Sequence, residues 1–234
     1  MTDQGPIILL TRPQAQAEAF RRRLGSGAEV LISPVLEITP LLLGVNPASY
    51  AGLIFTSQNA VRAAASQAAL AGMQAWAVGR HTAAAARAAG MRVTSANGTA
   101  DDLVALITRA RPAGRLLFLR GEHSRGQVAE RLNSAGIETD SEVIYRQEER
   151  PLSARALTVL QGERPVIVPL FSPRSARLLS RQAAGARAPL HLLAMSPAVL
   201  AAWEGPLPAS ARTVELPEAE AMAREILRHV AHPP

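Results

Sequence analysis

The chain has 234 residues, of which 48% are hydrophobic and 19% charged, a composition typical of a globular protein with a buried core. It contains neither cysteine nor lysine, since all 25 basic residues are arginine, and this excludes thiol nucleophiles, disulfides, thiolate metal sites and lysine Schiff bases. The net charge of +6 favours an anionic partner, but only 3% of the residues are aromatic and no basic stripe is present, so a small polyanion fits better than nucleic acid.

Targeting and cofactor signals are absent from the sequence. No apolar run is long enough to cross a bilayer, and Met1–Pro6 lacks the basic start of a signal peptide. No HExxH motif occurs, and no GxGxxG follows an apolar run, so metal and dinucleotide sites are not predicted. We therefore expect a cytoplasmic protein without metal or cofactor.

Short apolar runs, each followed by a small polar loop and then by a helical pattern, form a series of three that occurs twice. The offset between the two series is nearly constant, as an internal duplication would produce. The repeat alone would divide the chain near residue 113. The six runs are Ile7–Leu10, Leu53–Phe55, Ala75–Val78, Leu116–Leu119, Val166–Leu170 and Leu192–Ala194.

The runs are continuously apolar, which predicts parallel strands that are covered on both faces. Pro173 and Pro197 stand where a first helical residue would, and Ser172 and Ser196 precede them as N-caps. Strand–helix–strand units of this kind predict an α/β fold with doubly wound parallel sheets.

Three stretches do not follow the pattern. Pro169 interrupts the run Val166–Leu170, and because proline cannot donate to a sheet ladder, we expect an edge strand or a bulge there. Pro34–Pro40 and Glu142–Arg146 are apolar but fit no strand–helix unit, and we interpret both as extended links.

Motifs at the ends of the predicted strands have the order and spacing of a known family. They are Leu9–Pro13, Pro34–Pro40, Ile54–Val61, Ala77–Ala83, Leu119–Glu122, Val143–Arg146 and Phe171–Pro173. On these motifs the chain resembles the uroporphyrinogen-III synthase family over nearly its whole length. The resemblance implies a cofactor-independent cyclising lyase, which converts the linear tetrapyrrole hydroxymethylbilane into uroporphyrinogen III with loss of water and inversion of the terminal pyrrole.

The resemblance also implies a domain organisation that differs from the repeat. It predicts two doubly wound parallel-sheet domains, joined by two extended linker segments, with a cleft between them. One domain would comprise residues 1–36 plus 147–234 and the other residues 39–143, with linkers near 34–40 and 142–146. We adopt this division, and we expect a monomer.

Candidate substrate-binding residues lie in the loops that follow the six strands, since ligands of open α/β sheets bind at the carboxyl ends of strands. Helix N-termini and arginine side chains suit carboxylates, and hydroxymethylbilane bears an acetate and a propionate on each pyrrole. Each serine or threonine could instead be only a helix cap, and each arginine a solvated surface residue. The candidates are Thr11, Arg12, Thr56, Ser57, Gly79, Arg80, Thr82, Arg120, Gly121, Ser172, Arg174 and Ser196.

Tyr145 is the catalytic candidate by resemblance, which places it in the cleft. Its hydroxyl would help the substrate's terminal hydroxyl leave as water, either by donating a proton or by orienting the group through a hydrogen bond. The alternative is a half-buried aromatic side chain with a solvated hydroxyl. His81 and His123 lie in or beside loops and could shuttle protons.

One departure from the family pattern leaves other functions open. In the last loop the family commonly has Gly-Pro followed by threonine, whereas here Ser196-Pro197 is followed by Ala198-Val199. A second hypothesis is therefore a non-catalytic protein of the same fold that binds a tetrapyrrole or another polycarboxylate. A third is a two-lobed periplasmic-type solute receptor, against which the missing signal peptide argues.

Overall fold

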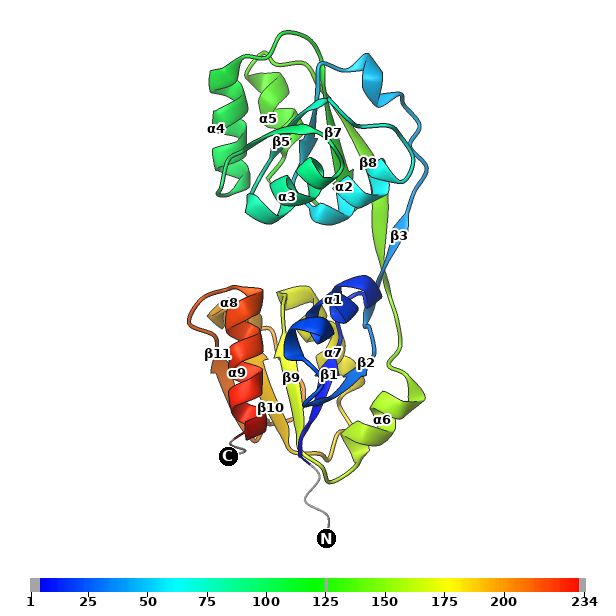
Figure 1. Cartoon of the computed structure of the whole chain (residues 1–234), viewed down its shortest axis with the longest axis vertical. Helices are drawn as coiled ribbons and strands as arrows, with labels where there is room; N and C mark the ends of the chain where they lie inside the picture. Colours follow the sequence, from blue (N-terminus) through cyan, green and yellow to red (C-terminus); the bar gives the residue numbers. More distant parts are fainter. Residues whose placement is uncertain (1–4, 125, 232–234) are drawn as a thin grey trace. The chain divides into compact units, whose positions relative to one another are not determined.

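The computed structural model describes residues 5–124 and 126–231 (Figure 1). Its contacts divide the chain into two compact units: unit 1 is Met1–Glu37 with Glu148–Pro234, and unit 2 is Ile38–Gln147. Each unit is built on a parallel sheet, so the predicted α/β class with parallel sheets is confirmed. No helix in the described ranges is both long enough and apolar enough to span a membrane.

Unit 1 contains a five-stranded sheet in the order β11-β10-β9-β1-β2, in which every pair of neighbours is parallel. Its elements are β1 (Ile7–Leu10), α1 (Gln14–Leu24), β2 (Glu29–Ile32), α6 (Ala154–Gln161), β9 (Val166–Leu170), α7 (Pro173–Gln182), β10 (Leu190–Ala194), α8 (Pro197–Leu200), β11 (Ser210–Thr213) and α9 (Ala219–Ala231).

Both faces of this sheet are buried because successive side chains of a strand point to opposite faces. Leu9 packs into the apolar cluster that also holds side chains of α6, α7 and α8. Ile8 and Leu10 pack into a second cluster with side chains of α1 and α9. The continuous apolar runs of the sequence therefore line two cores, one on each side of the sheet (Figure 1).

The prediction for Pro169 is wrong. Its strand, β9, is the middle strand of the sheet, and its register with β10 runs without interruption from Val166 to Leu170. On the other side, β9 pairs with β1 only at Val166 and Ile167. Pro169 lies beyond that pairing, so its missing N–H removes no hydrogen bond to β1, and neither an edge position nor a bulge is required.

Unit 2 contains a six-stranded sheet in the order β3-β8-β7-β4-β5-β6. The strands β4, β5 and β7 lie in this one sheet, although the sequence repeat assigns them to different halves, so the division near residue 113 is wrong. Its elements are β3 (Leu36–Pro40), η1 (Pro47–Ser49), β4 (Gly52–Phe55), α2 (Gln58–Ala65), β5 (Gln74–Ala77), α3 (Arg80–Ala88), β6 (Arg92–Ser95), α4 (Ala100–Ala110), β7 (Leu116–Gly121), α5 (Val128–Ser134) and β8 (Thr139–Glu149).

The second sheet is also covered on both faces. Leu117 and Leu119 of β7 pack with side chains of α2 and α3, whereas Leu116 and Phe118 pack with side chains of α4 and α5. The two segments interpreted as links contribute to this sheet: Leu36–Pro40 is β3, and Glu142–Arg146 lies within β8.

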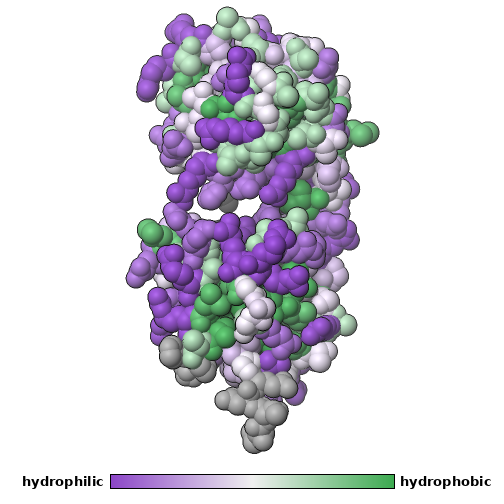
Figure 2. All heavy atoms as spheres, viewed as in Figure 1, coloured by the Kyte–Doolittle hydropathy of each residue, from purple (hydrophilic) through white to green (hydrophobic). Residues whose placement is uncertain are grey.

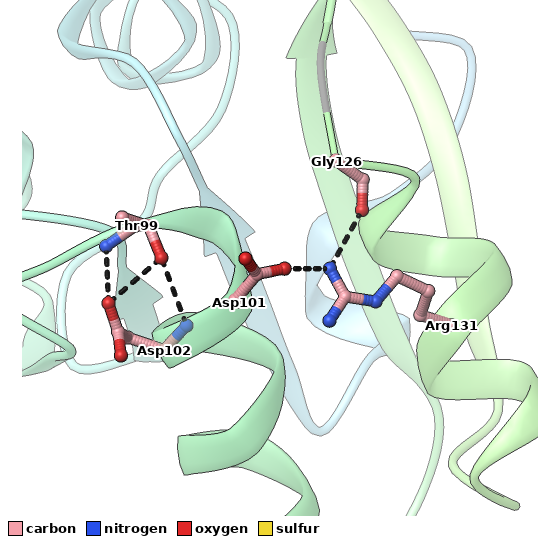
Figure 3. Close-up of polar contacts among 5 residues, drawn as sticks. All are labelled: Thr99, Asp101, Asp102, Gly126 and Arg131. Atoms are coloured by element: carbon pink, nitrogen blue, oxygen red, sulfur yellow. Dashed lines mark hydrogen bonds and ion pairs between the residues drawn. The ribbon is translucent and has the colours of Figure 1, made fainter.

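The two helices on the second face of this sheet are joined by polar contacts at their N-terminal ends (Figure 3). Thr99 and Asp102 form a capping box at the start of α4: the Thr99 N–H donates to Asp102 Oδ2 at 2.7 Å, and the Asp102 N–H donates to Thr99 Oγ1 at 3.4 Å. Arg131 of α5 donates to Asp101 Oδ1 at 2.6 Å and to the Gly126 carbonyl at 3.3 Å. These contacts fix the end of the loop that follows β7.

Candidate functional site

Each sheet has one point at which its strand order reverses. In unit 1 the chain begins with β1, places β2 on one side of it and later returns with β9 on the other. In unit 2 the corresponding strands are β4 and β7. Loops that leave the carboxyl ends of two such strands diverge, which is why ligands of open α/β sheets bind there. We call these the β1/β9 and β4/β7 switch points.

Candidate residues lie at both points, each within its own unit. Thr11 and Arg12 follow β1 and Ser172 follows β9, while Ser57 follows β4 and Arg120 is the penultimate residue of β7. On the face drawn in Figure 2, hydrophilic residues gather at the carboxyl edge of the unit 1 sheet, near the labelled α1 and α8 of Figure 1. A polar, charged ligand suits such an edge.

Contacts with Gln16 and Phe171 help to hold Arg12 at the β1/β9 switch point. Its Nη2 donates to Gln16 Oε1 at 3.0 Å, one turn further along the chain. Its Cζ lies 4.1 Å from the centroid of the Phe171 ring, which follows β9, and Phe171 in turn packs edge-on against Phe20 with centroids 5.1 Å apart. A guanidinium held in this way is suited to bind a carboxylate with paired N–H donors.

The serines at the ends of β9 and β10 are helix caps, as predicted. Ser172 Oγ accepts the Ser175 N–H at 3.2 Å and lies 2.8 Å from Ser175 Oγ. Ser196 caps the four-residue α8, where its Oγ accepts the Val199 N–H at 3.4 Å. A cap on one N–H leaves the positive end of the dipole of α7 directed at the same loop. Arg174, in the first turn of α7, is half-buried and engaged in contacts of its own.

The remaining candidates of unit 1 and the first loop of unit 2 differ in how open they are. Thr11 is buried, with 3% of its surface exposed, and its carbonyl accepts the Val35 N–H at 3.2 Å. Thr56 and Ser57 are half-buried, and Ser57 caps α2 by accepting the Asn59 N–H at 3.1 Å. Of these residues, Thr11 is therefore the one turned into the core.

The loop after β5 presents Gly79 as the N-cap of α3, followed by an exposed Arg80. A Cβ at Gly79 would meet no atom within 4 Å, so the space beside this backbone is open. Thr82 points the other way, because its side chain is buried in the first turn of α3. The structure thus brings Gly79 and Arg80 to the edge of the sheet and Thr82 to the core.

Arg120 has partners within its own part of the sheet. Its Nε donates to Ser141 Oγ at 2.8 Å, and its Nη1 donates to the carbonyls of Gly121 and Glu122 at 3.1 and 3.3 Å. Ser141 lies on the neighbouring strand β8. The guanidinium therefore bridges two strands at the carboxyl end of β7.

Tyr145 lies on β8 directly beside Gly121, its register partner on β7. The side chain is 6% exposed and packs into the apolar cluster formed with α2 and α3. Among the described residues, no hydrogen bond involves its hydroxyl, whereas its carbonyl accepts the Glu122 N–H at 3.0 Å. The ring is thus fixed by packing and by its backbone, and its hydroxyl is not used in holding the fold.

The sequence did not predict that three residues hold candidate residues in place: Phe171, Gln16 and Ser141. Gln16 follows Arg12 by four residues in a helical pattern, and this spacing could have indicated the pair. Phe171 precedes the Ser172 cap, but the strand pairing that brings it to Arg12 is not visible locally. Ser141 gives no local signal, because its partner lies on another strand.

The described groups with a shifted pKa lie away from the switch points. Burial and the hydrogen bond from Tyr50 to Asp140 raise the pKa of Tyr50, and this pair sits at the amino ends of the strands. His81 is exposed, and His123 is exposed with its Nε2 3.9 Å from Glu122 Oε2. No group of three or more His, Asp or Glu side chains gathers as metal ligands would within residues 5–124 and 126–231.

Comparison with known proteins points to one family. A family model described as Uroporphyrinogen-III synthase HemD matches residues 17–222. A search of curated proteins found no significant match.

Two solved structures share the fold over almost the whole of both chains. A uroporphyrinogen-III synthetase from Helicobacter pylori 26695 aligns with a TM-score of 0.65 and 15% identity, covering 96% of this chain and 99% of the other. A mutant uroporphyrinogen III synthase from the extremely thermophilic bacterium Thermus thermophilus aligns with a TM-score of 0.52 and 14% identity, covering 97% and 99%.

Proposed function

This chain belongs to the uroporphyrinogen-III synthase family, and we propose how its residues perform the reaction of that family. The members are cyclising lyases of tetrapyrrole synthesis, which convert hydroxymethylbilane into uroporphyrinogen III. The observation that carries this function is the family match over residues 17–222, and it favours an enzyme over a non-catalytic binding protein.

The reaction of the family depends more on the conformation in which the substrate is held than on a reactive side chain of the enzyme. Loss of water from the terminal hydroxymethyl group leaves an azafulvene, which the substituted carbon of the terminal pyrrole attacks to give a spiro intermediate. Fragmentation and reclosure then invert that pyrrole. Without an enzyme the bilane closes with no inversion, so the protein must hold the chain in the conformation that leads to the spiro intermediate.

Positioning of this kind can contribute about 7 to 11 kcal/mol to lowering a barrier in favourable systems. We propose that Arg12, Arg80 and Arg174 bind substrate carboxylates together with the helix N-termini at Ser57, Gly79 and Ser172. What supports this is the position of these residues at the carboxyl ends of parallel strands and the stacking that fixes Arg12. We include Thr56 and Ser196 in the same proposed set. The buried Thr11 and Thr82, and Arg120 and Gly121 at the end of β7, would instead hold the binding loops in place.

Tyr145 is our proposed catalytic residue. Its hydroxyl would hydrogen-bond to the departing hydroxyl of the substrate and help it leave as water. Within the described chain no residue forms a hydrogen bond with the Tyr145 hydroxyl, and this supports the role, since the hydroxyl is available to a ligand.

We propose that one substrate molecule engages residues of both units, which β3 and β8 connect. A flexible molecule with carboxylates along its whole length would need anion-binding groups at many places, and candidates occur in each unit. We also propose that the protein acts as a cytoplasmic monomer, which gel filtration coupled to light scattering would test.

The function is tested by adding the purified protein to freshly generated hydroxymethylbilane and separating the uroporphyrinogen isomers after oxidation. We expect isomer III in excess over the spontaneously formed isomer I. A product that contains isomer I alone, together with saturable binding of the bilane, would instead indicate a non-catalytic binding protein.

A further inference from the structure

Gly121 is the residue whose lack of a side chain matters most to Tyr145. A Cβ built at Gly121 would lie 2.4 Å from Cζ, 2.7 Å from the hydroxyl oxygen and 2.8 Å from Cε2 of Tyr145. Contacts between carbon atoms are ordinarily about 3.5 to 4.0 Å, so the ring occupies space that any side chain at Gly121 would need. The φ angle of Gly121 is not in the left-handed region, and the requirement is therefore steric.

The backbone places the ring there through an irregularity between β7 and β8. The register runs from Leu116 opposite Thr139 to Arg120 opposite Val143, and it then shifts so that Gly121 stands opposite Tyr145. An extra residue of this kind re-aims the following side chain. The hydrogen bond of 3.0 Å from the Glu122 N–H to the Tyr145 carbonyl closes the irregular segment.

Arg120 holds the same segment from the side. Its Nη1 donates to the carbonyls of Gly121 and Glu122, and its Nε donates to Ser141 Oγ on β8 at 2.8 Å. The two strands are thus tied on both sides of the position where the Tyr145 ring lies. Nothing in this arrangement uses the Tyr145 hydroxyl itself.

We infer that Gly121 is a positioning residue, which acts on the reaction by allowing the Tyr145 hydroxyl to lie against β7, and that Arg120 and Ser141 hold the backbone in the required register. The inference rests on the proposed catalytic role of Tyr145. It assigns Gly121 an action through the tyrosine rather than direct contact with substrate.

The change Gly121→Ala would act mainly on the end of the ring that carries the hydroxyl, because the atoms in conflict are the hydroxyl oxygen, Cζ and Cε2. The ring would have to retreat by about 1 Å to reach an ordinary contact distance, and a misplacement of that size can lower turnover about a hundredfold. The backbone of β7 need not change, since the conflict is with the far end of a side chain.

The experiment compares kcat and KM for isomer III formation, together with the thermal midpoint, in four proteins: the wild type, Gly121→Ala, Tyr145→Phe and the double variant. Gly185→Ala serves as the matched control, because a Cβ at Gly185 would meet no atom within 4 Å and its φ is not left-handed. In the wild-type background we expect Gly121→Ala to lower kcat strongly and to change KM little. In the Tyr145→Phe background the same change should lower kcat little further.

An equal loss from Gly121→Ala in both backgrounds would overturn the inference, since the glycine would then act independently of the hydroxyl. So would an unchanged kcat in a folded Gly121→Ala protein. A wild-type protein that forms no isomer III refutes the proposed function instead, so the two failures are distinguishable.

If Gly121→Ala does not fold, Ser141→Ala tests the same arrangement at an exposed position. It removes the hydrogen bond that Arg120 makes to β8 and leaves the core intact. A loss of kcat that disappears in the Tyr145→Phe background supports the inference, and a loss of equal size in both backgrounds, or no loss, contradicts it.

Discussion

The ring of Phe171 should determine how well Arg12 binds substrate. In Phe171→Leu the apolar volume beside Phe20 is largely kept, as is the Ser172 cap, but the surface 4.1 Å from the Arg12 guanidinium carbon is no longer aromatic. A cation–π contact at a partly exposed site contributes about 1 kcal/mol, which corresponds to a factor of about five in affinity.

Because the carboxylates of the substrate do not react, Arg12 would bind the ground state and the transition state equally. Losing its positioning should therefore raise KM about fivefold and leave kcat nearly unchanged. Initial rates of isomer III formation across a range of hydroxymethylbilane concentrations measure both constants. Phe171→Tyr, which keeps the ring, is the matched control and should retain the wild-type KM.

The mechanism requires that the effect pass through the arginine. In an Arg12→Ala background, Phe171→Leu should change KM no further. If the same fivefold rise occurs without the arginine, or if KM stays at its wild-type value in a folded Phe171→Leu protein, the stack does not position a substrate-binding group.

Three further changes have defined outcomes. Tyr145→Phe should lower kcat for isomer III by at least about a hundredfold while the thermal midpoint stays unchanged, and wild-type turnover in this variant would remove the residue from the mechanism. Thr99→Ala should lower the free energy of unfolding by about 1 kcal/mol in urea titrations at neutral pH, since it removes a helix cap. In the same variant, NMR titration should show that the pKa of Asp102 rises only part of the way toward its ordinary 3.8. The Thr99 N–H, the larger cause of the lowered pKa, remains in the variant, whereas the Thr99 hydroxyl, the smaller cause, is lost; an unchanged pKa would show that the hydroxyl does not contribute. Burial and the neighbouring His229 lower the pKa of His191, so the unfolded chain binds more protons below its ordinary pKa of 6.5 and stability should fall as the pH drops through that value. His191→Gln should show a shallower fall in urea midpoint over the same range, and identical curves would refute the assignment.

The central strands could be predicted from the sequence, and the edge strands could not. Ile7–Leu10 and Val166–Leu170 are strands with the predicted bounds, because both are buried on two faces and read as unbroken apolar runs. The strands Glu29–Ile32, Arg92–Ser95 and Ser210–Thr213 fall outside the repeated series. β6 and β11 lie at sheet edges with exposed or half-buried residues, and their polar composition resembles that of a loop.

Caps at the candidate site were also predictable, but partners across strands were not. Ser172 followed by Pro173 is a local signal, and it marks the start of α7. The bonds from Arg120 to Ser141 and the contact of Gly121 with Tyr145 depend on a register shift between β7 and β8 that no local pattern encodes. The prediction for Pro169 was wrong because it also depended on strand pairing. A proline is tolerated in a middle strand only where the pairing with one neighbouring strand has ended, and no local pattern shows where that is.

The chain order of the two sheets has a consequence for biosynthesis. In the sequence, all of unit 2 lies between the two parts of unit 1. In the sheet of unit 1, β1 lies between β2 and β9, and β9 is synthesised much later than β1 and β2. Unit 2 can therefore fold while the protein is still being translated. In contrast, β1 is covered by α1 on one face only and cannot pair with β9 until Val166–Leu170 has been synthesised. Pauses or truncations before that point would leave a folded unit 2 with an aggregation-prone N-terminal tail.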